Sequence, residues 1–337
     1  MKKNLLYGLI VLFINLLLIC PQELSAAPSF YEGKIITIVV GSSPGGGYDR
    51  IARILAKYLP KYIPGKPTII IQNMEGATSI IAANYLYNIA KPDGLTLGVV
   101  NRGLPFAQLL KTEGVKFDLM KFAWIGSPAI ESNVLTVRAD TPYKSIEDLR
   151  NAKGPIKFGA GGVASSSTHF PLLLKAFAGI KNIHMVQYRS SSEVALAIER
   201  KEVDGKATSY ASFKTQILRG HYRPLIRGRV IEPGIERLPV DEDLTNDPIG
   251  KKLMALRSGP DRIGRPVFAP PKTPPELMKI LREAFAKTTN DPEVQAMAEK
   301  LEMGIEYVPA EECLKILKDL FSQPDSIVKE FGKYIKF

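Results

Sequence analysis

The sequence is poor in the side chains that bind metals and form disulfides. Its 337 residues include two cysteines, three histidines and one tryptophan. Cys20 lies in an N-terminal segment that we expect to be removed, which leaves Cys313 as the single thiol and excludes an intrachain disulfide, a thiolate zinc site and an iron–sulfur cluster. His169, His184 and His221 are not spaced as metal ligands. We therefore expect no metal and no cofactor.

Long apolar runs are missing after the first 20 residues. Residues 1–27 have a basic start, an apolar run from Leu5 to Cys20 and small residues up to Ala27, which is the pattern of a secretory signal peptide. Asn15 interrupts the run, which is shorter than the ~20 residues that a transmembrane helix needs. We expect cleavage after Ala26 or Ala27 and export. Acylation at Cys20 and retention as an uncleaved anchor are the alternatives.

Acidic residues are outnumbered, since 45 Lys and Arg face 34 Asp and Glu, for a formal charge of +11. The basic residues are spread along the chain and form no block interleaved with aromatics, so the pattern does not indicate nucleic-acid binding. A basic exported protein would favour encounters with small anionic solutes. A surface adapted to its environment explains the charge equally well.

The stretch from Ile35 to Arg53 combines a strand, a glycine turn and a helix. Ile35–Val40 is an apolar, β-branched run of the length of a buried strand. Residues 41–47, Gly-Ser-Ser-Pro-Gly-Gly-Gly, can continue neither a strand nor a helix, and from Tyr48 apolar residues recur at helical spacing. The unpaired N–H groups at such a helix start suit an anion. A purely structural turn is the alternative.

This turn lacks the patterns of nucleotide sites. A P-loop has Lys and then Ser or Thr after its last glycine, whereas Gly46 is followed by Gly47 and Tyr48. The dinucleotide fingerprint fails because Arg50 occupies its third glycine position. Hydroxyl groups, such as that of Ser42, can add hydrogen-bond donors for another kind of anion.

Two further strands are expected to end at the same edge of the sheet. Residues 68–72 form the second strand, and the loop at 73–79 leads into a helix that runs to Ala90. Residues 95–100 form the third strand, which delivers Asn101 and Arg102 to its carboxyl end. Because ligands of open parallel sheets collect at that edge, three loops are predicted to face one crevice.

A second glycine segment, residues 159–169, repeats the arrangement of strand, glycines, hydroxyls and helix. It also reads Gly-x-Gly-x-x-Ala, so a dinucleotide site has to be considered. Such a site calls for an acidic residue about 20 positions further on, at the tip of the next strand. That tip is Gln187–Ser190 and has no carboxylate. The segment is better interpreted as a second anion-binding loop.

The rest of the chain alternates strands and helices, which predicts mostly parallel sheets covered by helices. We place the passage into a second lobe near residues 126–133 and the return near 262–270, so that residues 28–127 with 260–337 form the first lobe and 128–259 the second. Three amphipathic helices are expected at 275–289, 291–303 and 310–321. The two anion-ready loops then face each other across a cleft.

Catalytic patterns are weak. The serines at 165–167 lack the G-x-S-x-G context of a nucleophile elbow. His169 falls in the first turn of a helix, whose dipole lowers the pKa of an imidazole, and we interpret it as a ligand-contacting or solvated donor. Arg102 and Arg189 follow strand ends and are candidates for holding a carboxylate, whereas Arg138 is interpreted as structural.

Seven segments carry a resemblance to a known family. They lie at residues 38–53, 72–77, 92–97, 157–169, 188–190, 203–205 and 268–274, and their order is the family's order. They resemble the exported solute receptors of tripartite tricarboxylate transporters, the TctC-like or Bug proteins. The resemblance covers nearly the whole mature chain.

The resemblance implies a type II periplasmic binding protein: two α/β lobes with mixed, mostly parallel sheets that close on a ligand and perform no reaction. The implied ligands are small carboxylates such as di- or tricarboxylates, acidic amino acids or aromatic acids. The implied partners are the membrane permease subunits of a tripartite tricarboxylate transporter, served by a periplasmic monomer with no role for nucleic acid.

Carried onto this sequence, the family's ligand loops correspond to residues 42–49, 75–79 and 160–169. With the strand-end and helix-start positions added, the predicted ligand-binding residues are Ser42, Pro44, Gly45, Gly46, Gly47, Tyr48, Asp49, Gly76, Ala77, Thr78, Ser79, Arg102, Ala160, Gly161, Ser165, Ser166, Thr168, His169, Arg189 and Ser209.

Departures from the family pattern leave the ligand open. Glu75 stands where the family commonly has proline, Tyr48 follows the glycines, and Tyr188–Ser190 replaces Tyr-Lys-Gly. Two alternatives to a transport receptor stay open: a secreted serine hydrolase that uses Ser166 and His169, and a sensory receptor for an organic acid.

Overall fold

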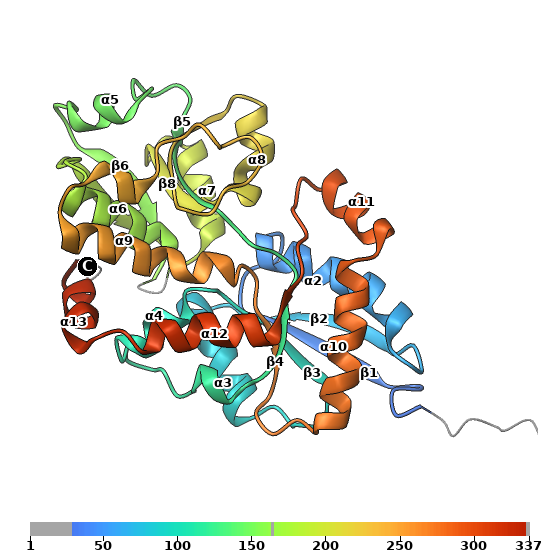
Figure 1. The fold of residues 1–337 in the computed structure, drawn as a ribbon. Helices are drawn as coiled ribbons and strands as arrows, with labels where there is room; N and C mark the ends of the chain where they lie inside the picture. The colour runs from blue at the N-terminus through green and yellow to red at the C-terminus, as the bar shows by residue number, and fades with distance from the viewer. Residues whose placement is uncertain (1–28, 163–164, 335–337) are drawn as a thin grey trace, which may run out of the picture.

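The chain folds into two α/β halves, each built around its own sheet (Figure 1). The computed structural model describes residues 29–162 and 165–334. The expected signal peptide, residues 1–27 with Cys20, lies outside the described residues. The predicted two-lobed α/β fold is confirmed.

The first sheet has six strands in the described part of the chain. They are β1 (Ile35–Val40), β2 (Thr68–Asn73), β3 (Thr96–Val99), β4 (Ala123–Ser127), β10 (Val267–Ala269) and β11 (Val308–Pro309). Their order is β11-β4-β10-β3-β1-β2. β1 pairs in parallel with β2 and β3, and the strands on the other side of β3 pair antiparallel.

The second sheet is built from the central part of the chain. Its strands are β5 (Asn133–Arg138), β6 (Ile156–Ala160), β7 (Ile183–Gln187), β8 (Gly205–Ser209) and β9 (Tyr222–Arg227), in the order β7-β6-β8-β5-β9. β6 pairs in parallel with β7 and β8, whereas β5 is antiparallel to β8 and β9. Each sheet is therefore mixed, with its parallel part on one side.

Helices cover both faces of each sheet (Figure 1). Their bounds are α2 (Gly47–Tyr58), α3 (Ile80–Asn88), α4 (Leu104–Leu109), α5 (Ile146–Arg150), α6 (Ser166–Phe177), α7 (Ser191–Glu199), α8 (Tyr210–Leu218), α9 (Pro248–Ser258), α10 (Pro275–Thr289), α11 (Pro292–Lys300), α12 (Ala310–Phe321) and α13 (Asp325–Tyr334). Short 3-10 turns lie at η1 (Leu59–Tyr62), η2 (Ala77–Ser79), η3 (Leu119–Lys121), η4 (Asp241–Leu244) and η5 (Gly259–Arg262).

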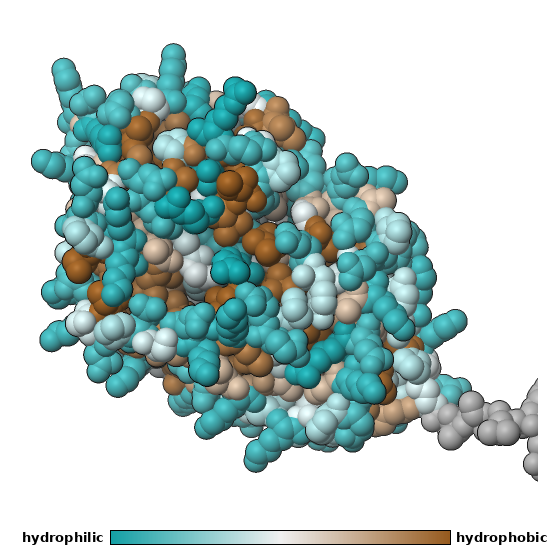
Figure 2. All heavy atoms as spheres, viewed as in Figure 1, coloured by the Kyte–Doolittle hydropathy of each residue, from teal (hydrophilic) through white to brown (hydrophobic). Residues whose placement is uncertain are grey.

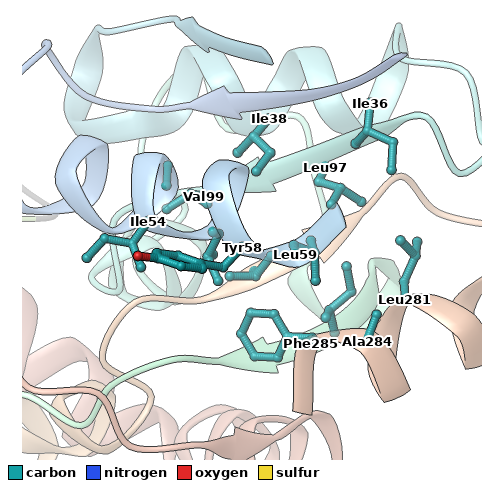
Figure 3. Close-up of a cluster of buried hydrophobic side chains, with 14 of the residues drawn as sticks. Ile36, Ile38, Ile54, Tyr58, Leu59, Leu97, Val99, Leu281, Ala284 and Phe285 are labelled. Carbon is teal, nitrogen blue, oxygen red and sulfur yellow. The ribbon is translucent and has the colours of Figure 1, made fainter. Parts of the chain in front are cut away.

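The apolar spacing of β1 and α2 explains how the first half packs. Ile36 and Ile38 alternate along β1 toward one face, and Ile54 and Tyr58 recur one turn apart on α2. Figure 3 shows these side chains meeting Phe285 of α10 and its neighbours in one cluster. Burying a large apolar side chain contributes roughly 1.5–3 kcal/mol, so this cluster fixes the position of the α2 start.

In the described part of the chain, three segments cross between the halves, and the third, between α12 and α13, lies near the C-terminus. The first joins β4 to β5 and includes Glu131, and the second joins α9 through η5 to β10 and includes Asp261. The C-terminal helix α13 packs against α6 of the second half, where Phe331 and Tyr334 contact His169 and Phe177. Residues near the C-terminus therefore contribute to the second hydrophobic core.

The predicted elements mostly match the structure. The strands at 35–40, 68–72 and 133–138 and the three C-terminal helices begin within one residue of their predicted starts. Helices α4, α9 and α13 were not predicted. Cys313 is fully buried, and burial raises the pKa of its thiol to about 12, as suits a structural thiol.

On the face shown in Figure 2, hydrophobic residues form separate patches in a mostly hydrophilic surface. Within residues 29–162 and 165–334, none of the helices combines the length and the hydrophobicity that a membrane span requires.

Candidate ligand-binding cleft

A cleft with a volume of about 170 Å³ lies between the two halves. Pockets for drug-sized ligands span roughly 300–1,000 Å³, so this cleft suits a smaller, compact molecule. Both predicted glycine segments line it. The predicted ligand-binding residues among its lining residues are Ser42, Gly46, Gly47, Tyr48, Gly76, Thr78, Ser79, Arg102, Gly161, Ser165, Ser166, His169, Arg189 and Ser209.

The side chain of Asp49 holds the first glycine segment in place through hydrogen bonds and does not itself line the cleft. Its buried carboxylate accepts hydrogen bonds from Gly45 N at 2.8 Å, Arg53 Nε at 2.8 Å and Asn73 Nδ2 at 2.9 Å. Asn73 also donates to Ser42 O. Although burial opposes it, this set of hydrogen bonds lowers the pKa of Asp49 below its ordinary value. The loop therefore has a fixed shape, with the N–H groups of the α2 start at the cleft.

Two glycines of this segment have different surroundings. A side chain added at Gly47 would collide with the Arg265 guanidinium, whereas at Gly46 the nearest atom, Ser43 O, would lie 3.4 Å away. Gly46 also has an extended backbone, with φ −69° and ψ 167°. The hydroxyl oxygen of Ser42 is buried beside them and has no hydrogen-bond partner among the described residues. Its hydrogen-bonding capacity is therefore unused within the described residues.

The second loop contains three consecutive non-glycine residues with positive φ: Ala77 at 44°, Thr78 at 52° and Ser79 at 74°. Such conformations cost of order 1–3 kcal/mol each and persist where their surroundings enforce them. Ser79 supplies that support, because its Oγ donates to Gly41 O at 2.6 Å and accepts from Asn101 N at 3.0 Å. One hydroxyl thus links the loops that follow β1, β2 and β3.

The glycine segment of the second half is also held from within. Ser167 Oγ accepts from Gly161 N at 2.9 Å, and Thr168 Oγ1 donates to Gly162 O at 3.0 Å. His169 is buried, with its ring edge-on to Phe106, 5.0 Å between centroids. Ser166 lies in the first turn of α6 and lines the cleft.

Helix starts converge on the cleft from both halves. The first half contributes the start of α2, and the second half those of α6, α7 and α8. Each helix start presents unpaired N–H groups and the positive end of a dipole, so their combined field favours an anion. The residues at these starts that line the cleft include Gly46, Gly47, Ser165, Ser166, Ser190, Ser191, Ser192 and Ser209.

Arg102 lines the cleft, but its guanidinium is already engaged. Nη1 donates to Glu131 at 2.8 Å, Nε to Asp261 at 3.0 Å and Nη2 to Asn133 at 2.8 Å. Glu131 and Asp261 lie on two different crossing segments. Arg102 therefore ties the end of β3 to two of the three connections between the halves, and its role as a ligand clamp stays a prediction.

The ion pairs of Arg102 extend into a larger set that we call the crossover network. Its members are Arg102, Glu131, Asp241, Arg257, Asp261 and Arg265. All six are buried, and the three arginines match the three carboxylates. The half-buried Glu232 lies next to the network, where burial and the charge of Glu131 raise its pKa to about 7. The network adds no net charge to the cleft.

Six predicted ligand-binding residues are not among the cleft's lining residues. Asp49 and Thr168 hold the loops as described, and Ala160 is the buried last residue of β6. Gly45 has φ 80° and bends the first loop. The complete set is Pro44, Gly45, Asp49, Ala77, Ala160 and Thr168.

Sequence reasoning missed other residues of the cleft. Lys206 lies within β8, the strand that ends at the predicted ligand-binding residue Ser209, but no role was predicted for Lys206 itself. Its signal was a lysine in an otherwise uncharged run, residues 205–213. Glu131 lies in the predicted passage at 126–133, whereas Asp241 and Asp261 lie outside both predicted passages, and none of the three was connected to the cleft. The missed lining residues with charged or amide side chains are Glu131, Asn133, Lys206, Arg257, Asp261 and Arg265, whereas Glu75 lies in the predicted ligand loop 75–79 and Asn101 at the predicted strand end.

The arrangement offers hydrogen-bond donors to an anion from both halves of the molecule. Within the described ranges, no group of three His, Cys, Asp or Glu side chains is arranged to hold a metal ion. Donors prevail at the cleft, as backbone N–H groups, hydroxyls and an ammonium group. These groups recognise carboxylate oxygens.

The family model described as "Tripartite tricarboxylate transporter family receptor" matches residues 51–333. Among curated proteins, the "UPF0065 protein in tcbD-tcbE intergenic region" of Pseudomonas sp. (strain P51) is 27% identical over 304 residues, which is 89% of this chain and 84% of that protein.

Solved structures show the same fold. The periplasmic binding protein BugD matches with a TM-score of 0.73 at 20% identity, over 90% of this chain and 98% of its own. MatC from Rhodopseudomonas palustris, solved with bound malate, matches with a TM-score of 0.69 at 19% identity, over 88% and 99%. R. palustris Rpa4515, solved with adipate, gives 0.72 at 20% identity, over 89% and 97%.

Proposed function

The chain belongs to the tripartite tricarboxylate transporter receptor family, and from this premise we propose that it is an exported receptor that binds a small organic acid and passes it to a membrane permease. Malate and adipate, the ligands of two structural neighbours, define the class of compound. The lobes that close on it would be residues 28–127 with 260–337 and residues 128–259. Residues 1–27 would direct export as a cleaved signal peptide.

One observation carries this proposal: Gly41 and Gly161, 120 residues apart in the chain, line a single small cleft, and the glycine segment of each precedes a helix start. A diacid could direct one carboxylate to the start of α2 and the other to the starts of α6 and α7. Ser42 and Ser166 would donate from opposite sides. Both carboxylates of the ligand would then accept hydrogen bonds from the protein, and binding would need no chemical change in the ligand.

The expected affinity follows from the number of donors. A hydrogen bond to a charged group contributes roughly 1.5–3 kcal/mol, so four or five such bonds give about micromolar binding after the cost of association. We propose that the solute is released unchanged. With 4-nitrophenyl acetate we expect no hydrolysis that depends on Ser166, and turnover abolished in Ser166→Ala would favour a hydrolase instead.

The direct test is calorimetric titration of the mature protein with malate, adipate and citrate, and with uncharged adipamide as the negative control. We expect at least one acid to bind and adipamide not to bind. Gly46→Val should weaken binding at least tenfold without unfolding the protein, because Gly46 lines the cleft and an added Cβ would lie 3.4 Å from its nearest atom. Ser166→Ala should weaken it about threefold or more.

Gly154→Val is the matched control, because Gly154 is an exposed turn residue with open space around it. If both cleft variants bind as tightly as the wild type, the two glycine segments do not form the ligand site. If the wild type binds none of the acids, the proposed ligand class is wrong.

A further inference from the structure

The cations of the cleft are not equivalent. The buried ones among the described lining residues are Arg102, Lys206, Arg257 and Arg265. Each arginine belongs to the crossover network and pairs with a buried carboxylate. Lys206 forms no ion pair with any carboxylate in the described part of the chain. Its charge is the one that the cleft's own buried groups leave unbalanced.

The position of Lys206 explains why it matters for a ligand. Its side chain extends from β8 between α7 and α8, where it is 3% exposed. The ammonium donates to Ser191 Oγ at 2.7 Å and lies 5.4 Å from the centroid of the Phe213 ring. Ser191 is the first residue of α7, so the ammonium sits at a helix start that lines the cleft.

Such an arrangement is unfavourable without an anion. An ammonium has three donors, and one serine hydroxyl and one aromatic ring satisfy only part of its hydrogen-bonding capacity. Burial without a counter-ion is costly, and burial lowers the pKa of Lys206 to about 8, which leaves it mostly protonated at neutral pH. The positive end of the α7 dipole also stabilises a negative charge bound at this position.

We propose that Lys206 is the anchor for one carboxylate of the ligand and determines the charge specificity of this receptor. The inference rests on the proposed function. The carboxylate would bind between the Lys206 ammonium and the hydroxyls and N–H groups at the start of α7. A second acidic group would reach the neutral donors of the first half, so diacids are preferred over monoacids of similar size.

The test compares Lys206→Met with the wild type by calorimetry, with malate, adipate and the monoacid hexanoate as probes. Methionine approximates the lysine stem and removes the charge. Lys157→Met is the matched control, since Lys157 is an exposed lysine on the adjacent strand β6. We expect Lys206→Met to bind malate and adipate about tenfold to a hundredfold more weakly, and Lys157→Met to bind like the wild type. The wild type should bind hexanoate more weakly than adipate.

A second measurement separates an anchor from a structural lysine. Removing an unbalanced buried charge should raise the melting temperature of the ligand-free protein by about 2 °C or more, while affinity falls. A lower melting temperature with unchanged affinity would show that Lys206 only supports the fold, and the inference would be overturned.

The two failures are distinguishable. If the wild type binds the acids and Lys206→Met binds them equally well, the receptor function stands and Lys206 is not the anchor. If the wild type binds neither malate nor adipate, both the ligand class and the anchor are overturned.

Discussion

The two sides of the cleft hold their polar groups in different ways. On the first side, Asp49, Asn73 and Ser79 hydrogen-bond the loops to one another, and Arg102 is fully engaged by the crossover network. On the second side, Lys206 has one hydroxyl partner and no carboxylate. The first side is a preformed, charge-balanced surface of donors, whereas the second carries an unbalanced positive charge.

This difference indicates that the two sides of the cleft recognise different properties of a ligand, one its shape and the other its charge. A rigid loop lowers the entropy cost of binding, and it can carry strain such as the three positive-φ residues after Gly76 because Ser79 holds them in place. An unbalanced charge stores unfavourable energy that an anion relieves. We infer that the first side selects the size of the ligand and the second its charge.

The largest expected effect comes from removing a cation on the balanced side. Arg102→Met would leave Glu131 and Asp261 short of a partner in a buried network, and breaking such a pair costs about 3–5 kcal/mol. We expect a lower urea midpoint at pH 7, measured by circular dichroism. This is the opposite sign from the one expected for Lys206→Met.

Arg200→Met is the control, since Arg200 is exposed at the end of α7. It should change the free energy of unfolding by less than about 0.5 kcal/mol. A loss in Arg102→Met as small as that of the control would mean that the carboxylates do not depend on Arg102, and the two sides would then not differ in charge balance.

Much of the fold could be predicted from local pattern. The β-branched run at 35–40, the glycines after it and the helical spacing from Tyr48 each determine backbone conformation within a few residues. Helix α9 was missed because its polar, proline-rich surroundings hide a helix that begins with Pro248 after the capping Asp247. Strand direction was harder, since the antiparallel pairing of β5 and β10 depends on how the chain crosses between the halves.

The candidate site divides in the same way. The backbone donors of the glycine segments were predictable because helix starts have a local signature. The ion pairs of Arg102 could not be predicted, because its carboxylate partners lie 29 and 159 positions further along the chain. Lys206 was overlooked because its unbalanced charge appears only when the neighbouring strands and helices are assembled.

A smaller effect is expected where a carboxylate shapes the first loop. Asp49→Asn keeps the size of the side chain but removes the charge, and it places an amide NH₂ group, which is a donor, where a carboxylate oxygen accepts hydrogen bonds. Charge-assisted hydrogen bonds contribute about 1.5–3 kcal/mol in favourable cases, so we expect a loss of about 1–3 kcal/mol at pH 7 and weaker ligand binding. The measurement is urea unfolding between pH 3 and 7.

The pH dependence has a defined sign. Because the pKa of Asp49 is lowered in the folded protein, its contribution to stability is complete above the ordinary value of 3.8 and is lost as the pH falls through the lowered value. The gap between the wild type and Asp49→Asn should therefore narrow toward pH 3. Asp319→Asn, at an exposed position on α12, should show no such gap. A gap independent of pH would mean that the carboxylate charge is not what holds the loop.

The smallest expected effect on stability and affinity is that of Ser192→Ala, and it is compared with Ser191→Ala at the neighbouring serine of the α7 start. Ser192 Oγ reaches Ser43 Oγ across the cleft at 3.4 Å, at an exposed position where water can replace the contact, so Ser192→Ala should change stability by less than about 0.5 kcal/mol and affinity less than about twofold. Ser191→Ala instead removes the hydroxyl that accepts from Lys206, and it should weaken binding of adipate more than Ser192→Ala does. If Ser192→Ala has the greater effect in calorimetry, the ligand's charge is bound at the mouth of the cleft, where Ser192 meets Ser43, and the second side owes its selectivity to exposed hydroxyls instead of the buried ammonium.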